Sequence, residues 1–66
     1  MAIGERLKEL REKKNMSQRE VAQALGISQP AYSYFECGDK IPSLAMTKAM
    51  ARFFNVTLDE LAGDRN

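Results

Sequence analysis

Apolar side chains recur at helical spacing along the chain, and no stretch alternates between apolar and polar residues as a half-buried strand would. From Ile3 to about Lys14, the positions of Ile3, Leu7 and Leu10 follow the i, i+4, i+7 spacing of one helix face. Most other residues of this segment are charged. The pattern predicts an amphipathic first helix and an all-α fold.

The next two segments carry dense signals for the start and end of a helix. Ser17 is placed to cap a helix, Glu20 completes a capping box three residues later, and Gly26 is placed to end the helix in a left-handed conformation. Ser28 and Gly38 repeat the cap and the stop. The turn L-G-I-S between the segments is typical of a helix-turn-helix unit. These signals predict helices from about Ser17 to Leu25 and from Ser28 to Gly38.

Two further helices are predicted in the C-terminal third. Ser43, which follows a proline, is placed to cap a helix from Leu44 to about Phe54. Thr57 and Glu60 form a second capping box, and Gly63 is placed to stop the last helix. The sequence therefore predicts five short helices in one domain, residues 1–66.

The predicted third helix has an uncharged outward face. Ala31, Tyr32 and Phe35 fall on one side and are expected to face the core. A merely solvated face would carry Lys and Glu, whereas polar amide, hydroxyl and aromatic groups can be desolvated against another surface at low cost. Glutamine matches the N6 and N7 edge of adenine, and a tyrosine ring can lie against a thymine methyl group. The outward residues are Gln29, at the N-terminal tip, with Pro30, Ser33, Tyr34 and Cys37.

Composition excludes several classes of function. The chain has no His and a single Cys, Cys37, so it lacks the parts of a disulfide framework and of a zinc site. It also lacks a nucleophile with its base and a glycine-rich phosphate loop, and we expect neither catalysis nor a cofactor or metal. A lone thiol without basic neighbours in sequence is more often a bystander than a redox sensor.

The balance of charge first argues against a nucleic-acid partner. Ten basic and nine acidic residues give a net charge of +1, whereas DNA-binding domains are usually basic. The charges are unevenly distributed, however, and the segment from Lys13 to Tyr34 contains three bases and one acid. We therefore expect a modest salt dependence of binding per subunit. Six of the nine acids lie near the two ends: Glu5, Glu9, Glu12, Asp59, Glu60 and Asp64.

The chain shows no sign of a targeting or membrane-spanning segment. The first ten residues, MAIGERLKEL, are charged from position five, and no apolar run approaches the roughly 18 residues of a spanning helix. We expect a cytoplasmic protein, associated with the nucleoid when it is bound to DNA. A chain of 66 residues buries little core, so stabilisation by a second copy is also expected.

The run S-Q-R-E-V-A-Q-A-L-G-I-S-Q-P-A-Y-S-Y-F-E-C-G, followed by I-P-S-L, resembles the phage Cro/repressor-type helix-turn-helix family, also called xenobiotic-response-element-like. The resemblance extends from about Ile3 to Leu61. It implies a five-helix, lambda-repressor-like domain that binds operator DNA, usually as a two-fold dimer, with its third helix in the major groove.

The resemblance also implies roles for individual residues. Gln18 is expected to reach a phosphate while bracing Gln29, and Arg11 and Glu36 are expected to form an ion pair between the first and third helices. Direct phosphate contact by Arg11 is the alternative. The residues implied to read bases are Gln29, Pro30, Ser33 and Tyr34. Those implied to follow the DNA backbone are Gln18, Arg19, Cys37, Lys40 and Ser43.

Apolar residues near the C-terminus are candidates for a dimer contact, and they are Met50, Phe53 and Leu58. Together these features predict a sequence-specific, double-stranded DNA-binding transcription regulator, expected to be a repressor. It would act as a homodimer on a pseudo-palindromic operator. The alternative is a protein-interaction module on the same scaffold, similar to an antitoxin that binds its partner through the uncharged helix face.

Overall fold

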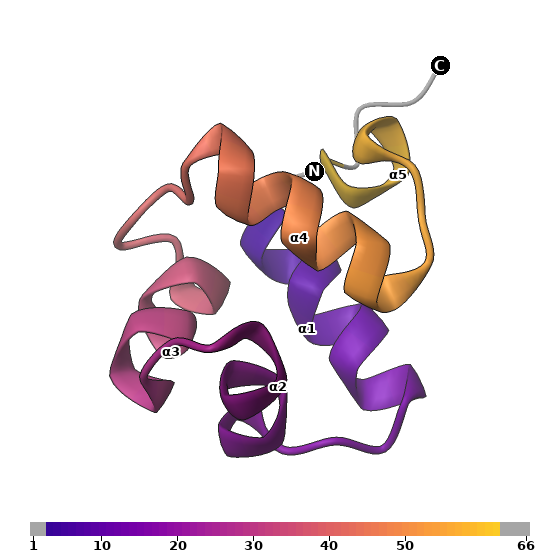
Figure 1. The fold of residues 1–66 in the computed structure, drawn as a ribbon. Helices are drawn as coiled ribbons and strands as arrows, with labels where there is room; N and C mark the ends of the chain where they lie inside the picture. Colours follow the sequence, from indigo (N-terminus) through magenta and orange to yellow (C-terminus); the bar gives the residue numbers. More distant parts are fainter. Residues whose placement is uncertain (1–2, 63–66) are drawn as a thin grey trace.

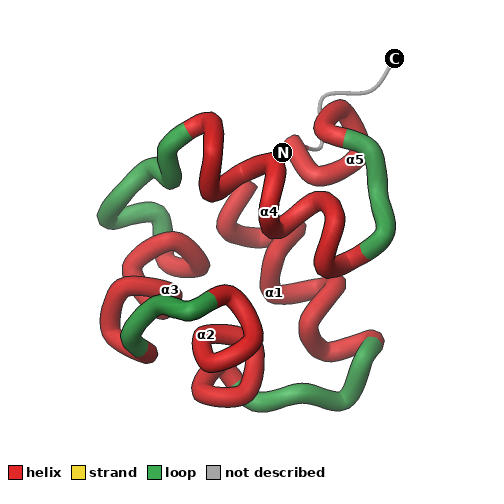
Figure 2. The backbone as a smooth tube through the Cα atoms, viewed as in Figure 1, coloured by secondary structure: helices red, strands yellow, loops and turns green. Residues whose placement is uncertain are grey.

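The structure is a computed structural model that describes residues 3–62, so the expected helix stop at Gly63 lies outside the described residues. It has five helices in this range and no strand, which confirms the all-α prediction (Figures 1 and 2). None of these helices is long and apolar enough to cross a membrane. Their bounds are α1 Ile3–Lys13, α2 Gln18–Leu25, α3 Gln29–Cys37, α4 Leu44–Phe54 and α5 Leu58–Ala62.

The capping signals set most of these bounds. The Oγ atom of Ser17 accepts a hydrogen bond of 3.0 Å from the backbone N–H of Glu20, whose carboxylate accepts one of 2.8 Å from the Ser17 N–H. Thr57 and Glu60 repeat this capping box at the start of α5. Gly26, with φ of 75°, ends α2 in the left-handed region that glycine adopts at little cost. The turn into α3 is therefore determined locally by the sequence.

One core joins all five helices. α1 packs against α3 and α5, α2 packs against α3 and α4, and α4 also packs against α5. The guanidinium Nε of Arg6 donates a hydrogen bond of 3.0 Å to the carbonyl oxygen of Glu60, which ties α1 to α5. The buried apolar residues come from every helix and are Leu7, Leu10, Val21, Ala22, Tyr32, Met50, Ala51, Phe54 and Leu61.

Candidate nucleic-acid interface

The third helix is anchored by one side and exposed on the other. The phenol ring of Tyr32 is fully buried, and Phe35 packs half-buried against the core. Ser28 caps the helix and Pro30 lies in its first turn, so the N-terminal end has a defined backbone conformation. The reading surface expected from the sequence is thus held on a rigid element.

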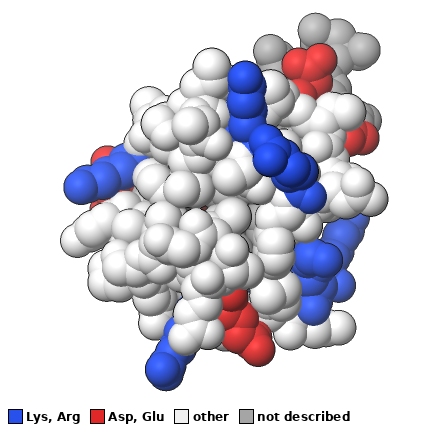
Figure 3. Space-filling view, viewed as in Figure 1, with Lys and Arg blue, Asp and Glu red and all other residues white. Residues whose placement is uncertain are grey.

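The four residues expected to read bases lie on α3 at different depths. Gln29 and Pro30 are exposed at the N-terminal tip, and the side chain of Tyr34 is exposed one turn later. Ser33 is half-buried, since it borders a pocket between α3 and the two preceding helices. In the space-filling view, the surface over α3 is uncharged, and Lys or Arg atoms occur only at its margins (Figure 3). The polar and aromatic side chains of this face can therefore be desolvated at a lower cost than charged ones.

Basic residues flank this uncharged face. Arg19 is exposed in the first turn of α2, and Lys40 is exposed in the loop after α3. The ammonium group of Lys40 lies 5.5 Å from the centre of the Tyr34 ring, an arrangement that the sequence did not indicate. Ser43 caps α4, with its Oγ accepting a hydrogen bond of 3.1 Å from the Met46 N–H. Three of the residues expected to follow the DNA backbone therefore lie on the surface. Arg19 lies on α2, and Lys40 and Ser43 lie in the loop between α3 and α4.

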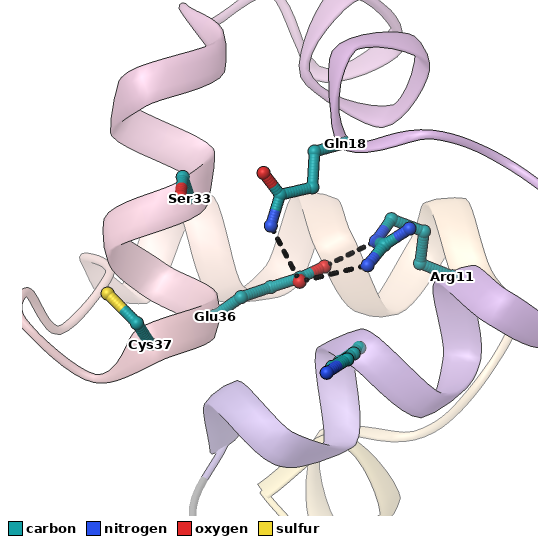
Figure 4. A pocket seen from close by; sticks show the side chains of 6 residues that line it. Arg11, Gln18, Ser33, Glu36 and Cys37 are labelled. Carbon is teal, nitrogen blue, oxygen red and sulfur yellow. Dashed lines mark hydrogen bonds and ion pairs between the residues drawn. The ribbon is translucent and has the colours of Figure 1, made fainter.

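Gln18 has a different partner from the expected one. Its Nε2 donates a hydrogen bond of 3.0 Å to a carboxylate oxygen of Glu36, a contact that the resemblance did not imply. The first turn of α2 thus contacts the end of α3 that holds Glu36, and the expected bracing of Gln29 stays a prediction. In Figure 4 the amide oxygen of Gln18 points away from Glu36.

Arg11 and Glu36 form the ion pair that the resemblance implied. The guanidinium donates through two nitrogens to the two carboxylate oxygens, at 2.7 and 3.2 Å, and through a third nitrogen to the carbonyl of Met16 at 2.9 Å. The pair is mostly shielded from water, with side-chain exposures of 13% for Arg11 and 5% for Glu36. The Glu36 carboxylate thus links α3 to α1 through Arg11 and to α2 through Gln18.

This environment shifts the pKa values of both partners. Burial alone raises the pKa of Glu36, but the hydrogen bonds from Arg11 and Gln18 outweigh it, and the net pKa is lowered. The hydrogen bond to Glu36 raises the pKa of Arg11. Both groups remain charged at neutral pH and act as a structural pair.

A pocket of about 260 Å³ adjoins this ion pair, between α1, α2 and α3. Figure 4 shows Ser33 and Cys37 one turn apart on the side of α3 that borders it. The thiol of Cys37 is exposed and donates a long hydrogen bond of 3.6 Å to the Tyr34 carbonyl. The residues that line the pocket are Lys8, Arg11, Gln18, Ser33, Glu36 and Cys37.

The hydroxyl of Tyr32 is buried beside the same pair. Burial raises the pKa of this phenol far above its usual range, and the nearby Glu36 carboxylate adds to the effect. The carboxylate is close enough to influence the hydroxyl, yet no hydrogen bond of normal geometry reaches that oxygen from any described residue. Among the described residues the Tyr32 hydroxyl is therefore buried and unpaired.

Gly4 is a structural residue that sequence reasoning missed. It is buried where α1 crosses the end of α3, and a Cβ atom there would lie 2.6 Å from the carbonyl oxygen of Phe35 and still nearer to that of Glu36. Only glycine allows this close approach of the two helices. A glycine in the first turn of a predicted amphipathic helix was the available signal.

The candidate dimer residues do not form one exposed surface. Met50 is completely buried in the core of a single chain, so the expectation that it contacts a second copy is wrong. Phe53 is half-buried, with its ring edge-on to Phe54 at 5.0 Å and 5.5 Å from the ammonium group of Lys14. Of the three, only Leu58 is exposed, at 39%. The helical periodicity of α4 directs Met50 inward with Phe54.

Comparisons with known proteins agree with this architecture. Residues 7–61 match a family model described as helix-turn-helix. The chain is 39% identical over 61 residues to the transcriptional activator BcrR of Enterococcus faecalis, covering 92% of this chain and 30% of BcrR. It is 44% identical over 59 residues to the transcriptional regulator AnsR of Bacillus subtilis, covering 89% of this chain and 51% of AnsR.

A phage protein is also similar. The transcriptional repressor RstR of the cryptic phage CTXphi in Vibrio cholerae is 30% identical over 59 residues, covering 89% of this chain and 53% of RstR. The chain spans from about a third to about half of the length of these three relatives. The helix order, the capped turn between α2 and α3 and the match over residues 7–61 lead to one conclusion: the chain belongs to the Cro/C1-type helix-turn-helix family.

Proposed function

We propose that this chain binds double-stranded DNA in a sequence-specific manner and regulates transcription, with α3 in the major groove. The observation that carries the proposal is the uncharged, exposed face of α3, held on a rigid base. Tyr32 anchors this helix in the core, and the Arg11–Glu36 pair with Gln18 fixes it against α1 and α2. Such preorganisation is what a reading surface needs, because loosely held side chains discriminate poorly between bases.

Gln29 is the principal base-reading residue in this proposal. It is exposed at the N-terminal tip of α3, the part of such a helix that meets base edges. Its side-chain amide can donate and accept in the fork that matches adenine N6 and N7. Tyr34 and Pro30 offer apolar contact to thymine methyl groups. The Ser33 hydroxyl can donate a hydrogen bond to a base or accept one from it.

Contacts to phosphates position the helix. Arg19 and Lys40 are the exposed bases beside the reading face, and the side-chain amide of Gln18 has a second N–H donor besides the one that it gives to Glu36. Cys37, at the C-terminal end of α3, and Ser43, in the loop before α4, add weak hydrogen-bond donors to the DNA backbone. Two bases per subunit give a modest electrostatic attraction, so paired half-sites on a pseudo-palindromic operator supply much of the specificity.

The relatives support regulation in general rather than one direction of it, since they include an activator and a repressor. Our proposal therefore concerns recognition of an operator by a homodimer, in a cytoplasmic protein that joins the nucleoid when bound. Whether transcription rises or falls depends on where the operator lies relative to the promoter.

Selection from random duplexes at low salt tests the proposal, followed by titration of the selected duplex at rising salt. We expect a defined motif, and affinity that falls with salt by a slope of about one to two per subunit. The rival protein-binding module predicts neither. Failure of any duplex to bind at low salt would overturn DNA recognition and favour that module.

A further inference from the structure

The exposed aromatic ring of α3 is in contact with a cation from the loop that follows the helix. Tyr34 is 43% exposed, and the ammonium group of Lys40 lies over its ring. A cation in this position is attracted by the negative charge on the face of the ring. Within residues 3–62 Lys40 forms no ion pair, although the exposed Asp39 precedes it. The ring of Tyr34 is therefore the side-chain partner of Lys40 in the described structure.

The backbone that ends α3 brings Lys40 back toward Tyr34. The carbonyl oxygen of Tyr34 accepts hydrogen bonds from three successive backbone N–H groups, those of Gly38 and Asp39 at 3.0 Å and that of Lys40 at 3.3 Å. Gly38 reverses the chain with φ of 87°, a conformation that glycine adopts at little cost. The contact between ring and ammonium is thus built on an ordered turn, and it costs less conformational entropy than a contact between two freely moving side chains.

This contact limits how a ligand can meet the ring of Tyr34. Lys40 occupies one face of the ring, so a ligand approaches its remaining exposed surface. Pro30 is exposed four residues earlier and lies on the same side of the helix. The free ring surface and the proline form an apolar strip beside a cation. In the major groove, the small apolar group that complements such a strip is the methyl group at C5 of a pyrimidine.

We propose that Lys40 is a positioning residue, which holds the Tyr34 ring so that its free surface contacts the 5-methyl group of a pyrimidine. This inference rests on the proposed function. Thymine carries that methyl group, as does 5-methylcytosine, whereas an unmethylated pyrimidine offers the ring no such contact. The ammonium of Lys40 has three N–H donors, so it can also reach a phosphate while it lies over the ring. One lysine thereby connects the contact to the DNA backbone with the preference for a base.

A lysine that contacts only a phosphate would behave differently. Lys40 and Tyr34 would then contribute independently, and the effects of their substitutions on DNA affinity would add. Positioning makes the two effects overlap, because the loss of either partner removes the same contact. The overlap should be about two- to fivefold in affinity, the size of an exposed contact between a cation and an aromatic ring.

Nuclear magnetic resonance of the full chain without DNA tests the contact itself. The ring current of Tyr34 should shift the Lys40 protons next to the ammonium nitrogen upfield. This shift should disappear in Tyr34→Ala and persist in Tyr34→Phe. Both side chains are exposed, so unchanged helical circular dichroism confirms that each variant folds. Lys40 proton shifts that are the same in the wild type and in Tyr34→Ala would overturn the inference.

Titration of a selected duplex tests the specificity. Parallel selection with Tyr34→Ala identifies the base pair whose preference depends on this residue, and we expect a thymine there. Its replacement by deoxyuridine, which lacks only the methyl group, should weaken wild-type binding about fourfold. Lys40→Arg and Tyr34→Phe should keep this preference, and Lys40→Met should lose most of it. The matched control Arg19→Ala should weaken binding to both duplexes equally. Cytosine and 5-methylcytosine at the same position show whether a methylated cytosine is read as well.

The outcomes separate this inference from the proposed function. Equal binding of the thymine and deoxyuridine duplexes, or a Tyr34-dependent position without thymine, would overturn the inference and leave DNA recognition standing. So would a Lys40→Met variant that weakens both duplexes by one factor, or additive effects of Lys40→Met and Tyr34→Ala. Failure of any duplex to bind would overturn the proposed function and this inference with it.

Discussion

Arg11 on α1 and Glu36 on α3 meet in a two-point ion pair, with N···O distances of 2.7 and 3.2 Å. The same carboxylate accepts from Gln18 on α2 at 3.0 Å, and the same guanidinium donates to the Met16 carbonyl at 2.9 Å. One largely shielded charge pair thus holds the helix-turn-helix unit against the first helix. Its predicted role is structural, and this separates it from the proposed reading surface on α3.

Arg11→Ala should lower the free energy of unfolding by about 3 kcal/mol, because it leaves the shielded Glu36 carboxylate without its positively charged partner. Urea unfolding measures this loss. The exposed Arg19 offers a matched control, since Arg19→Ala should change stability by less than about 0.5 kcal/mol but lower the salt slope of DNA binding by about one. An unchanged melting temperature for Arg11→Ala would contradict the structural role.

The lowered pKa of Glu36 makes stability depend on pH in the acid range. Since the folded-state pKa lies below the unfolded value of about 4.3, the contribution is fully present above that pH. It is lost as the pH falls through the folded-state pKa. The difference in unfolding free energy between wild type and Glu36→Gln should therefore narrow between pH 5 and about pH 2. A difference that stays constant over this range would mean that the carboxylate charge does not stabilise the fold.

Gly4→Ala should destabilise the chain by about 1–3 kcal/mol, because the added Cβ meets the backbone carbonyls of Phe35 and Glu36 at the α1–α3 crossing. Backbone atoms cannot rotate away, so the helices must separate. Lys8→Ala, on an exposed part of the same helix, serves as the control and should be nearly neutral. A gain in stability for Gly4→Ala, as helix propensity alone would give, would argue against this close crossing.

Tyr32→Phe should be neutral or slightly stabilising in thermal unfolding. The ring is fully buried and its hydroxyl is unpaired, so the substitution removes a desolvated polar atom while it keeps the packing. A hydroxyl bonded to the Glu36 carboxylate would instead contribute about 1.5–3 kcal/mol. A loss of that size would identify such a bond in solution.

Local sequence signals predicted the helices well because capping is a local interaction. Ser17 with Glu20 and Thr57 with Glu60 form the predicted capping boxes, and α4 has the predicted bounds. The left-handed Asn55 that ends α4 was missed, since asparagine signals a helix end less strongly than glycine.

Contacts between helices were harder to predict. The partner of Gln18 and the crowding at Gly4 depend on how α1, α2 and α3 cross, which no spacing within one helix encodes. The burial of Met50 was misjudged for a similar reason, because the margin of an apolar stripe faces inward or outward according to its neighbours. The exposed face of α3 was predictable, since one helix supplies it and helical periodicity separates Gln29 and Tyr34 from the buried Tyr32.

Parallel selection of random duplexes by the wild type and by Gln29→Ala tests the central claim, that the tip of α3 reads bases. Gln29 is exposed, so the substitution should leave the melting temperature unchanged. We expect the wild type to select a motif with a preferred base opposite Gln29, and the variant to lose about 1–3 kcal/mol of preference at that position alone. An identical motif for both proteins, or no motif for the wild type, would contradict the account.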